Sequence, residues 1–149
     1  MIRMKTVTYA ALLTAALALG ACSSAPMTEG TRSMMTPMSG AGEVPPVAGM
    51  GSGMAEVSYN PATYTLRWTV TYSGLSGPVS AGHFHGPAAA STNAPVVVPF
   101  TGSMASPITG SAVLTPAQAS DFVAGKWYVN LHTAANPGGE IRGQVAAAH

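Results

Sequence analysis

Apolar and polar residues alternate most clearly between Thr63 and Tyr72. Aromatic and aliphatic residues occupy every second position, and Thr or Arg fills the positions between them. Neighbouring side chains of a β-strand point to opposite faces, so this period of two predicts a strand with one buried and one Thr-rich face. A shorter alternation from Ala55 to Tyr59 precedes the turn sequence Asn-Pro-Ala-Thr at 60–63. The two segments are therefore predicted to form a β-hairpin.

Later segments with similar patterns are separated by Gly- and Pro-rich turns. The further predicted strands are 79–85, 95–100, 108–114, 127–132 and 140–146. Many short strands with turn signals between them are typical of an all-β fold. We expect an antiparallel Greek-key β-sandwich, either immunoglobulin-like or superoxide-dismutase-like.

One short helix is predicted near residues 116–124. Thr115 is a favoured N-cap residue, Pro116 fits the first helical position, and Gln118 completes a capping box. Gly125 fits the position just after the last turn, where glycine readily adopts a left-handed conformation. These signals limit the helix to about two to three turns.

The first 21 residues have the pattern of a signal peptide. Arg3 and Lys5 form a basic start, and the apolar run at 10–19 leads to small residues before Cys22. The run is too short for a transmembrane helix, which needs about 20 apolar residues. The plain alternative is an ordinary signal peptide that ends with Cys22 in its cleavage region.

The sequence Leu-Gly-Ala-Cys at 19–22 resembles a bacterial lipobox. That resemblance implies cleavage before Cys22 and lipidation of its thiol. Ser23 in place of Asp favours the outer membrane, facing the periplasm, if the host has two membranes. We therefore expect an exported protein whose membrane partner is the lipid bilayer, through Cys22. The chain has no other cysteine, so no internal disulfide can form.

Residues 22–39 are predicted to be a lipidated, flexible tether, followed by a folded domain at 40–147. The segment is rich in Ser, Thr, Pro, Gly and Met and shows no apolar periodicity. Met34, Met35 and Met38 lie in it, and soft thioethers can bind Cu(I). A linker of biased composition is the simpler interpretation.

Composition excludes several classes of protein. Charged residues make up 7% of the 149 residues, against about 25% in typical domains. The chain lacks the Glu and Lys of a coiled coil, and six Lys and Arg against five Asp and Glu cannot form a nucleic-acid-binding stripe. The solvated surface is therefore expected to consist mainly of Ser, Thr, Asn and Gly.

The strongest candidate for chemistry is the sequence His83-Phe84-His85. Residues i and i+2 of a strand share a face, so both imidazoles project together, and imidazole suits zinc and copper. His132 is the internal candidate for a third ligand, and it shares a strand face with Tyr128 and Asn130. The alternative is that these histidines are polar strand residues that serve only the fold.

Glu140 is a candidate for orienting an imidazole from behind the metal. The simpler interpretation is a charge at the start of a strand, paired with Arg142. No G-x-S-x-G, P-loop or H-E-x-x-H motif occurs in the sequence. With only five acidic residues, a buried carboxylate pair for glycoside hydrolysis is also hard to assemble. We therefore predict a protein that is not an enzyme.

Five sequence blocks resemble the CHRD (chordin) domain over about residues 40–146. They are Gly-Glu-Val-Pro-Pro-Val at 42–47, Tyr-Asn-Pro-Ala-Thr at 59–63 with Leu-Arg-Trp at 66–68, Gly-His-Phe-His-Gly-Pro-Ala at 82–88, Trp-Tyr-Val-Asn-Leu-His-Thr at 127–133 and Pro-Gly-Gly-Glu-Ile-Arg-Gly-Gln at 137–144. The chain departs from the family pattern at Gly82, Phe84 and Leu131, and none of these changes affects a histidine. The resemblance implies a CHRD domain at 40–147.

A weaker likeness connects the H-x-H strand and the late Gly-Gly segment with copper/zinc superoxide dismutase. That family's site needs more histidines than the three internal ones of this chain, so dismutase activity is disfavoured. The main hypothesis is an envelope protein that binds Cu or Zn through His83, His85 and His132. The alternative is a structural or protein-interaction module of the envelope without a metal, whose protein partner the sequence does not define.

Overall fold

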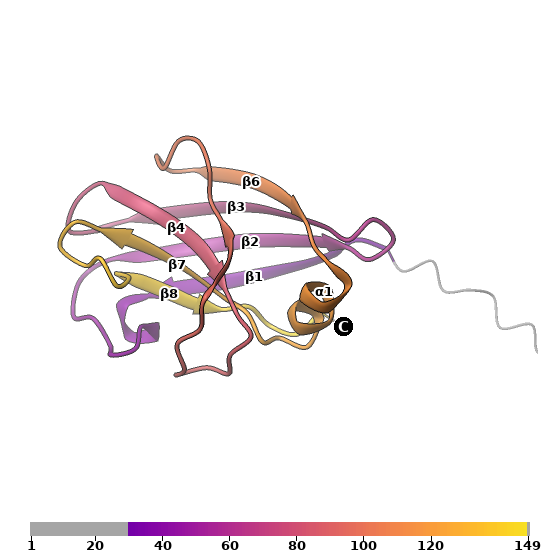
Figure 1. Ribbon diagram of the computed structural model, residues 1–149. Coiled ribbons are helices and arrows are strands. Elements are labelled where there is room, and N and C mark those ends of the chain that lie inside the picture. Colours follow the sequence, from indigo (N-terminus) through magenta and orange to yellow (C-terminus); the bar gives the residue numbers. More distant parts are fainter. Residues whose placement is uncertain (1–29, 149) are drawn as a thin grey trace, which may run out of the picture.

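Eight β-strands and one short α-helix form the part of the chain that the structure, a computed structural model, describes, residues 30–148 (Figure 1). The predicted signal peptide and Cys22 lie outside these residues. The strands are β1 (Arg32–Ser39), β2 (Ser52–Asn60), β3 (Thr65–Ser73), β4 (Val79–His85), β5 (Val96–Pro99), β6 (Ile108–Val113), β7 (Tyr128–Thr133) and β8 (Ile141–Gln144).

All the strands belong to one antiparallel sheet that is nearly closed, in the order β5-β4-β7-β8-β1-β2-β3-β6. Its two halves meet at β8 and β1, through the single residue pair Arg142 and Ser39. Figure 1 shows β4, β7 and β8 lying over β1, β2 and β3. The ring of Trp68 on β3 contacts Phe84 of β4 and Phe100 at centroid distances of 5.4 and 4.9 Å. The core therefore lies between the two halves, and the predicted antiparallel all-β class is confirmed.

The predicted hairpin is β2 and β3, paired from Ser52↔Ser73 to Asn60↔Thr65. The side chains of Leu66, Trp68 and Val70 are buried, as the alternation requires. The pattern fails at one position, because Tyr64 is in the turn with φ 55° and is 40% exposed.

The N-terminal boundary of the domain was predicted wrongly. Residues 32–39 are not a tether but strand β1, which pairs with β2 along its whole length. Met34, Thr36 and Met38 point into the core, whereas Met35 is 61% exposed. Methionine occurs on both faces, so hydropathy shows no period of two. The thioethers of Met34 and Met38 fill the core, which contradicts a flexible Met-rich linker.

The helix α1 (Pro116–Val123) begins and ends as the sequence predicts. Thr115 and Gln118 form both hydrogen bonds of the capping box. Gly125 has φ +71°, which permits the sharp exit toward β7. Phe122 packs on the core rings of Tyr59 and Trp127. Within residues 30–148, no helix is long and apolar enough to cross a membrane.

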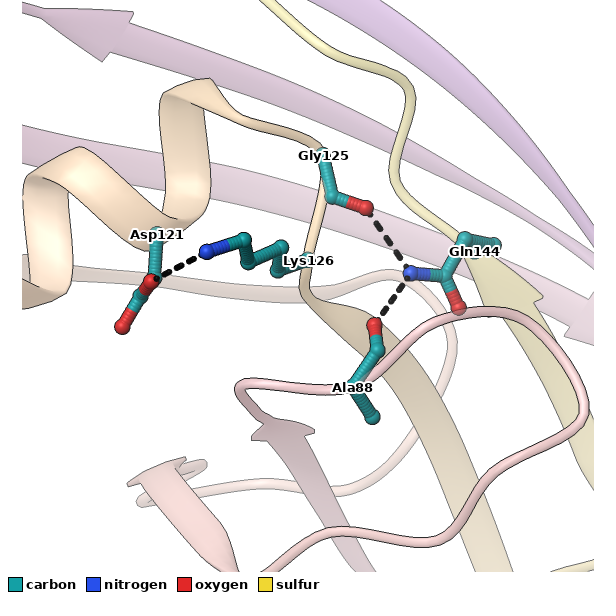
Figure 2. A network of polar contacts seen from close by, with 5 residues as sticks. All are labelled: Ala88, Asp121, Gly125, Lys126 and Gln144. Carbon is teal, nitrogen blue, oxygen red and sulfur yellow. Dashed lines mark hydrogen bonds and ion pairs between the residues drawn. The ribbon is translucent and has the colours of Figure 1, made fainter.

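Gln144 of β8 joins three segments that are far apart in the sequence (Figure 2). Its Nε2 donates to the carbonyl oxygens of Ala88, at 3.1 Å, and of Gly125, at 2.9 Å. The nearby ion pair of Lys126 and Asp121 is exposed, at 3.3 Å, so it contributes little to stability. Gln144 thus fixes the start of the loop 86–95, which runs beside the outer face of β4, β7 and β8.

Candidate metal centre

The three internal histidines meet on the outer face of β4 and β7. His83 and His85 point outward from β4, and Phe84 between them is fully buried in the core. The register of β4 with β7 places His83 opposite Asn130 and Ala81 opposite His132. One ligand nitrogen from each histidine lies within 4.8 Å of the other two. The residues that the sequence suggested therefore form a cluster that could hold a metal ion.

Backbone carbonyls determine the tautomers of two of these histidines. Nδ1 of His85 lies 2.9 Å from the oxygen of Ala94, and Nδ1 of His132 lies 2.9 Å from the oxygen of Pro137. A carbonyl oxygen can only accept, so both Nδ1 atoms carry a proton, and in the neutral imidazole Nε2 then carries a lone pair. The Nε2 of His85 is buried without a hydrogen-bond partner. The Nε2 of His132 lies 3.0 Å from Nδ1 of His83.

Burial favours the neutral forms of His83 and His85. Burial, with smaller contributions from His132 and His85, lowers the pKa of His83 to about 4. Burial also lowers the pKa of His85, although the hydrogen bond with the Ala94 carbonyl opposes the shift. At neutral pH these two imidazoles therefore keep a free lone pair, the form in which histidine binds metals.

Asn130 is a further member of the cluster, and its side chain is 2% exposed. Its Oδ1 lies 3.0 Å from Nε2 of His132. Its amide NH₂ faces the carboxylate of Glu43, which is 5% exposed. The strand pattern predicts that Asn130 shares a face with His132 but indicates no role for it, and Glu43 stands out in the sequence only as part of a family motif.

Gly139 allows the turn before β8 to approach this pair. Its φ is +126°, and a Cβ added there would lie 2.3 Å from Oε1 of Glu43 and 2.7 Å from Nδ2 of Asn130. Neither the conformation nor the space suits another residue. The glycine at position 139 is thus explained by contact with the polar cluster.

A layer of stacked side chains supports His85. Its ring lies parallel to that of Tyr128 at a centroid distance of 4.7 Å, and the guanidinium of Arg142 lies 3.3 Å from the Tyr128 centroid. Arg142 also donates to the loop 86–95, at Thr92 O (2.8 Å) and Asn93 Oδ1 (3.1 Å). These contacts hold the loop so that Ala94 can fix the His85 tautomer.

Glu140 does not have the position expected for it behind an imidazole. Its carboxylate accepts hydrogen bonds from the hydroxyls of Ser76 and Thr133 and from the Ser76 backbone N–H. Burial raises its pKa, but the bonds from Ser76 and Thr133 outweigh it and leave the pKa below the ordinary value. Glu140 therefore joins the β3–β4 loop to the β7–β8 turn. Backbone carbonyls take the orienting role, and these cannot be identified from residue types.

Comparison with known proteins agrees with the sequence blocks described above. The CHRD domain profile matches residues 34–145. No curated protein and no solved structure matches the chain. The matched span begins inside β1 and includes all three histidines, in agreement with the corrected domain boundary. The chain therefore belongs to the CHRD domain family.

Proposed function

We propose that this CHRD domain is a non-catalytic metal-binding protein, which takes one zinc or copper ion through His83, His85 and His132. The observation that carries the proposal is a surplus of hydrogen-bond acceptors. Nε2 of His85 and Nε2 of His132 both offer lone pairs, and His85 Nε2 has no partner. A buried acceptor without a partner costs about 1–3 kcal/mol, and a bound cation removes that cost.

The geometry supports a first-row metal with short bonds to nitrogen. Zinc binds imidazole at about 2.0–2.1 Å, so two nitrogens of a tetrahedral site lie about 3.3 Å apart. The nitrogens of His83 and His132 are 3.0 Å apart, and all three lie within 4.8 Å. Small rotations of the imidazole rings would therefore bring the three nitrogens to the spacing that one metal ion requires. His83 is only half-buried, which gives the ion a route from solvent.

The alternative is an interaction module in which the histidines serve only the fold. The contact of 3.0 Å between His83 Nδ1 and His132 Nε2 favours it, because a hydrogen bond there satisfies one lone pair without a metal. It leaves the Nε2 of His85 without a partner. The two functions differ in what a metal titration shows.

A calorimetric titration of the chelator-stripped full chain tests the metal proposal. We expect uptake of about one Zn(II) per chain, lost when His83→Ala and His85→Ala are combined. Glu56→Gln, which changes an exposed carboxylate on β2, is the control and should bind as the wild type does. A flat wild-type titration, or equal uptake by the double variant, would sink the proposal.

We also propose that the domain is exported and held at the envelope by a lipid on Cys22. The support is the basic start, the short apolar run and the lipobox-like sequence at 19–22. Cell fractionation tests it: wild type should sediment with membranes, and Cys22→Ala should not. An equal membrane fraction for both chains would contradict lipidation.

A further inference from the structure

The side-chain oxygen of Asn130 lies next to the ligand nitrogen of His132 in the candidate metal centre. Its Oδ1 lies 3.0 Å from Nε2 of His132, and Asn130 lies directly opposite His83 in the register of β4 with β7. In neutral His132, Nε2 carries a lone pair, because Nδ1 donates to Pro137 O. A carbonyl oxygen and a lone-pair nitrogen repel each other when nothing lies between them. Either a proton on Nε2 or a shared cation makes this approach favourable, and the three ligand nitrogens within 4.8 Å of one another favour the cation.

Glu43 determines which end of the Asn130 amide faces the histidines. The amide NH₂ of Asn130 faces the carboxylate of Glu43, and Gly139 packs directly against both groups. A reversed amide would place its oxygen against the carboxylate, acceptor facing acceptor. The oxygen of Asn130 is therefore directed toward the histidines in a buried environment.

We infer that Asn130 Oδ1 is the fourth ligand of the metal centre and that Glu43 is the residue that positions it. The inference rests on the proposed function and specifies its ligand set as three nitrogens and one oxygen. A separation of 3.0 Å from His132 Nε2 is close to that of two ligands on one tetrahedral ion.

This ligand set determines the class of metal. Imidazole binds zinc and copper, carbonyl oxygen is a hard donor, and Cu(I) prefers soft thioethers and thiolates. Met34 and Met38 do not alter this, since both are buried in the core. The centre should therefore select Zn(II) or Cu(II) over Cu(I).

The direct test compares the full chain with Asn130→Leu and Asn130→Asp. Leucine has a similar size but no oxygen, so we expect Zn(II) affinity, measured by competition with a chromophoric chelator, to fall about 10–100-fold. Affinity for Cu(I) should stay unchanged. Aspartate keeps an oxygen ligand and should restore Zn(II) binding. Wild-type Zn(II) affinity in Asn130→Leu would overturn the inference and leave the three-histidine site intact.

Electron paramagnetic resonance of the Cu(II)-loaded protein provides a readout that a purely structural role would not change. Asn130→Asp replaces a neutral oxygen ligand by a charged one, so its copper spectrum should differ from that of wild type. Identical spectra would overturn the inference even if Asn130→Leu does not fold. Absence of any Cu(II) or Zn(II) binding by wild type would instead reject the proposed function itself.

The positioning role of Glu43 has its own pair of variants. Glu43→Gln keeps an acceptor for the Asn130 NH₂ and should retain Zn(II) affinity. Glu43→Ala removes it, frees the amide to rotate, and should weaken Zn(II) binding in the direction of Asn130→Leu. Equal affinities for the two Glu43 variants would contradict the positioning role.

Discussion

At the scale of single residues, polar groups of the centre are held by main-chain contacts as much as by side chains. The carbonyls of Ala94 and Pro137 set the imidazole tautomers, and the bare Cα of Gly139 makes room for Glu43 and Asn130. Such contacts fix which atoms carry lone pairs. The positions and tautomers of the histidines therefore depend on the backbone of the loop 86–95 and of the β7–β8 turn.

Gly139→Ala should destabilise the fold by about 1–3 kcal/mol. The residue has φ +126°, and its new Cβ would meet Glu43 Oε1 at 2.3 Å. Gly138→Ala is a matched control, because no atom lies within 4 Å of its added Cβ. Urea unfolding measures both variants. Equal losses of unfolding free energy would argue against a specific role for Gly139.

Glu140 should make the fold sensitive to acid. Its pKa is lowered in the folded state, so its carboxylate stabilises the fold above the ordinary value of 4.5. That contribution is lost as the pH falls from 4.5 through the folded-state pKa. Glu140→Gln should therefore show a smaller loss of unfolding free energy over this range than wild type. Parallel pH profiles for the two proteins would contradict the prediction.

The sequence could identify the three histidines because H-x-H on a strand defines a shared face. It could not identify Asn130 as a member, since an Asn between Tyr128 and His132 is also an ordinary outward residue. Glu140 was misplaced for a related reason. Its hydrogen bonds to Ser76 and Thr133 depend on how a distant loop packs, which no local pattern contains.

At the scale of elements, the strands were predictable wherever large apolar residues alternate with Thr or Ser. The bounds expected for 79–85 coincide with β4, and the capping residues located α1. β1 was missed because Met lies on both faces and Pro37 lies within the strand. Local sequence patterns also could not predict that the two halves form one continuous sheet, because β8 and β1 are joined by a single residue pair.

Met38→Ala should cost about 2–5 kcal/mol, the usual price of truncating a fully buried side chain. Met38 is 2% exposed in the core, whereas Met35 on the same strand is 61% exposed. Met35→Ala should therefore change stability by less than about 0.5 kcal/mol. Thermal unfolding of the two variants compares them. Small effects in both would mean that residues 32–39 behave as a tether after all.

At the scale of the whole molecule, the low charge and the metal centre fit together. Two sheet halves bury an aromatic core, and the outer face of β4, β7 and β8 carries the buried polar cluster under the loop 86–95. The domain has few charged residues with which a metal could bind adventitiously. Nonspecific metal binding to the surface should therefore be weak, so that binding at the histidine cluster can be measured clearly.

Zinc should stabilise the folded chain if it binds only that state. At a free concentration of 100 times Kd, the gain in unfolding free energy is about 2.7 kcal/mol. The Tm should rise with zinc concentration in wild type and stay constant when His83 and His85 are both changed to Ala. A zinc-dependent Tm in the double variant would place the binding site elsewhere.

The most direct test is the location of zinc in crystals of the full chain grown with equimolar Zn(II), by anomalous scattering at the zinc edge. We expect one peak within about 2.0–2.1 Å of a nitrogen from each of His83, His85 and His132. Crystals without a peak at this cluster, or with zinc bound only at other residues, would contradict a metal centre in this fold.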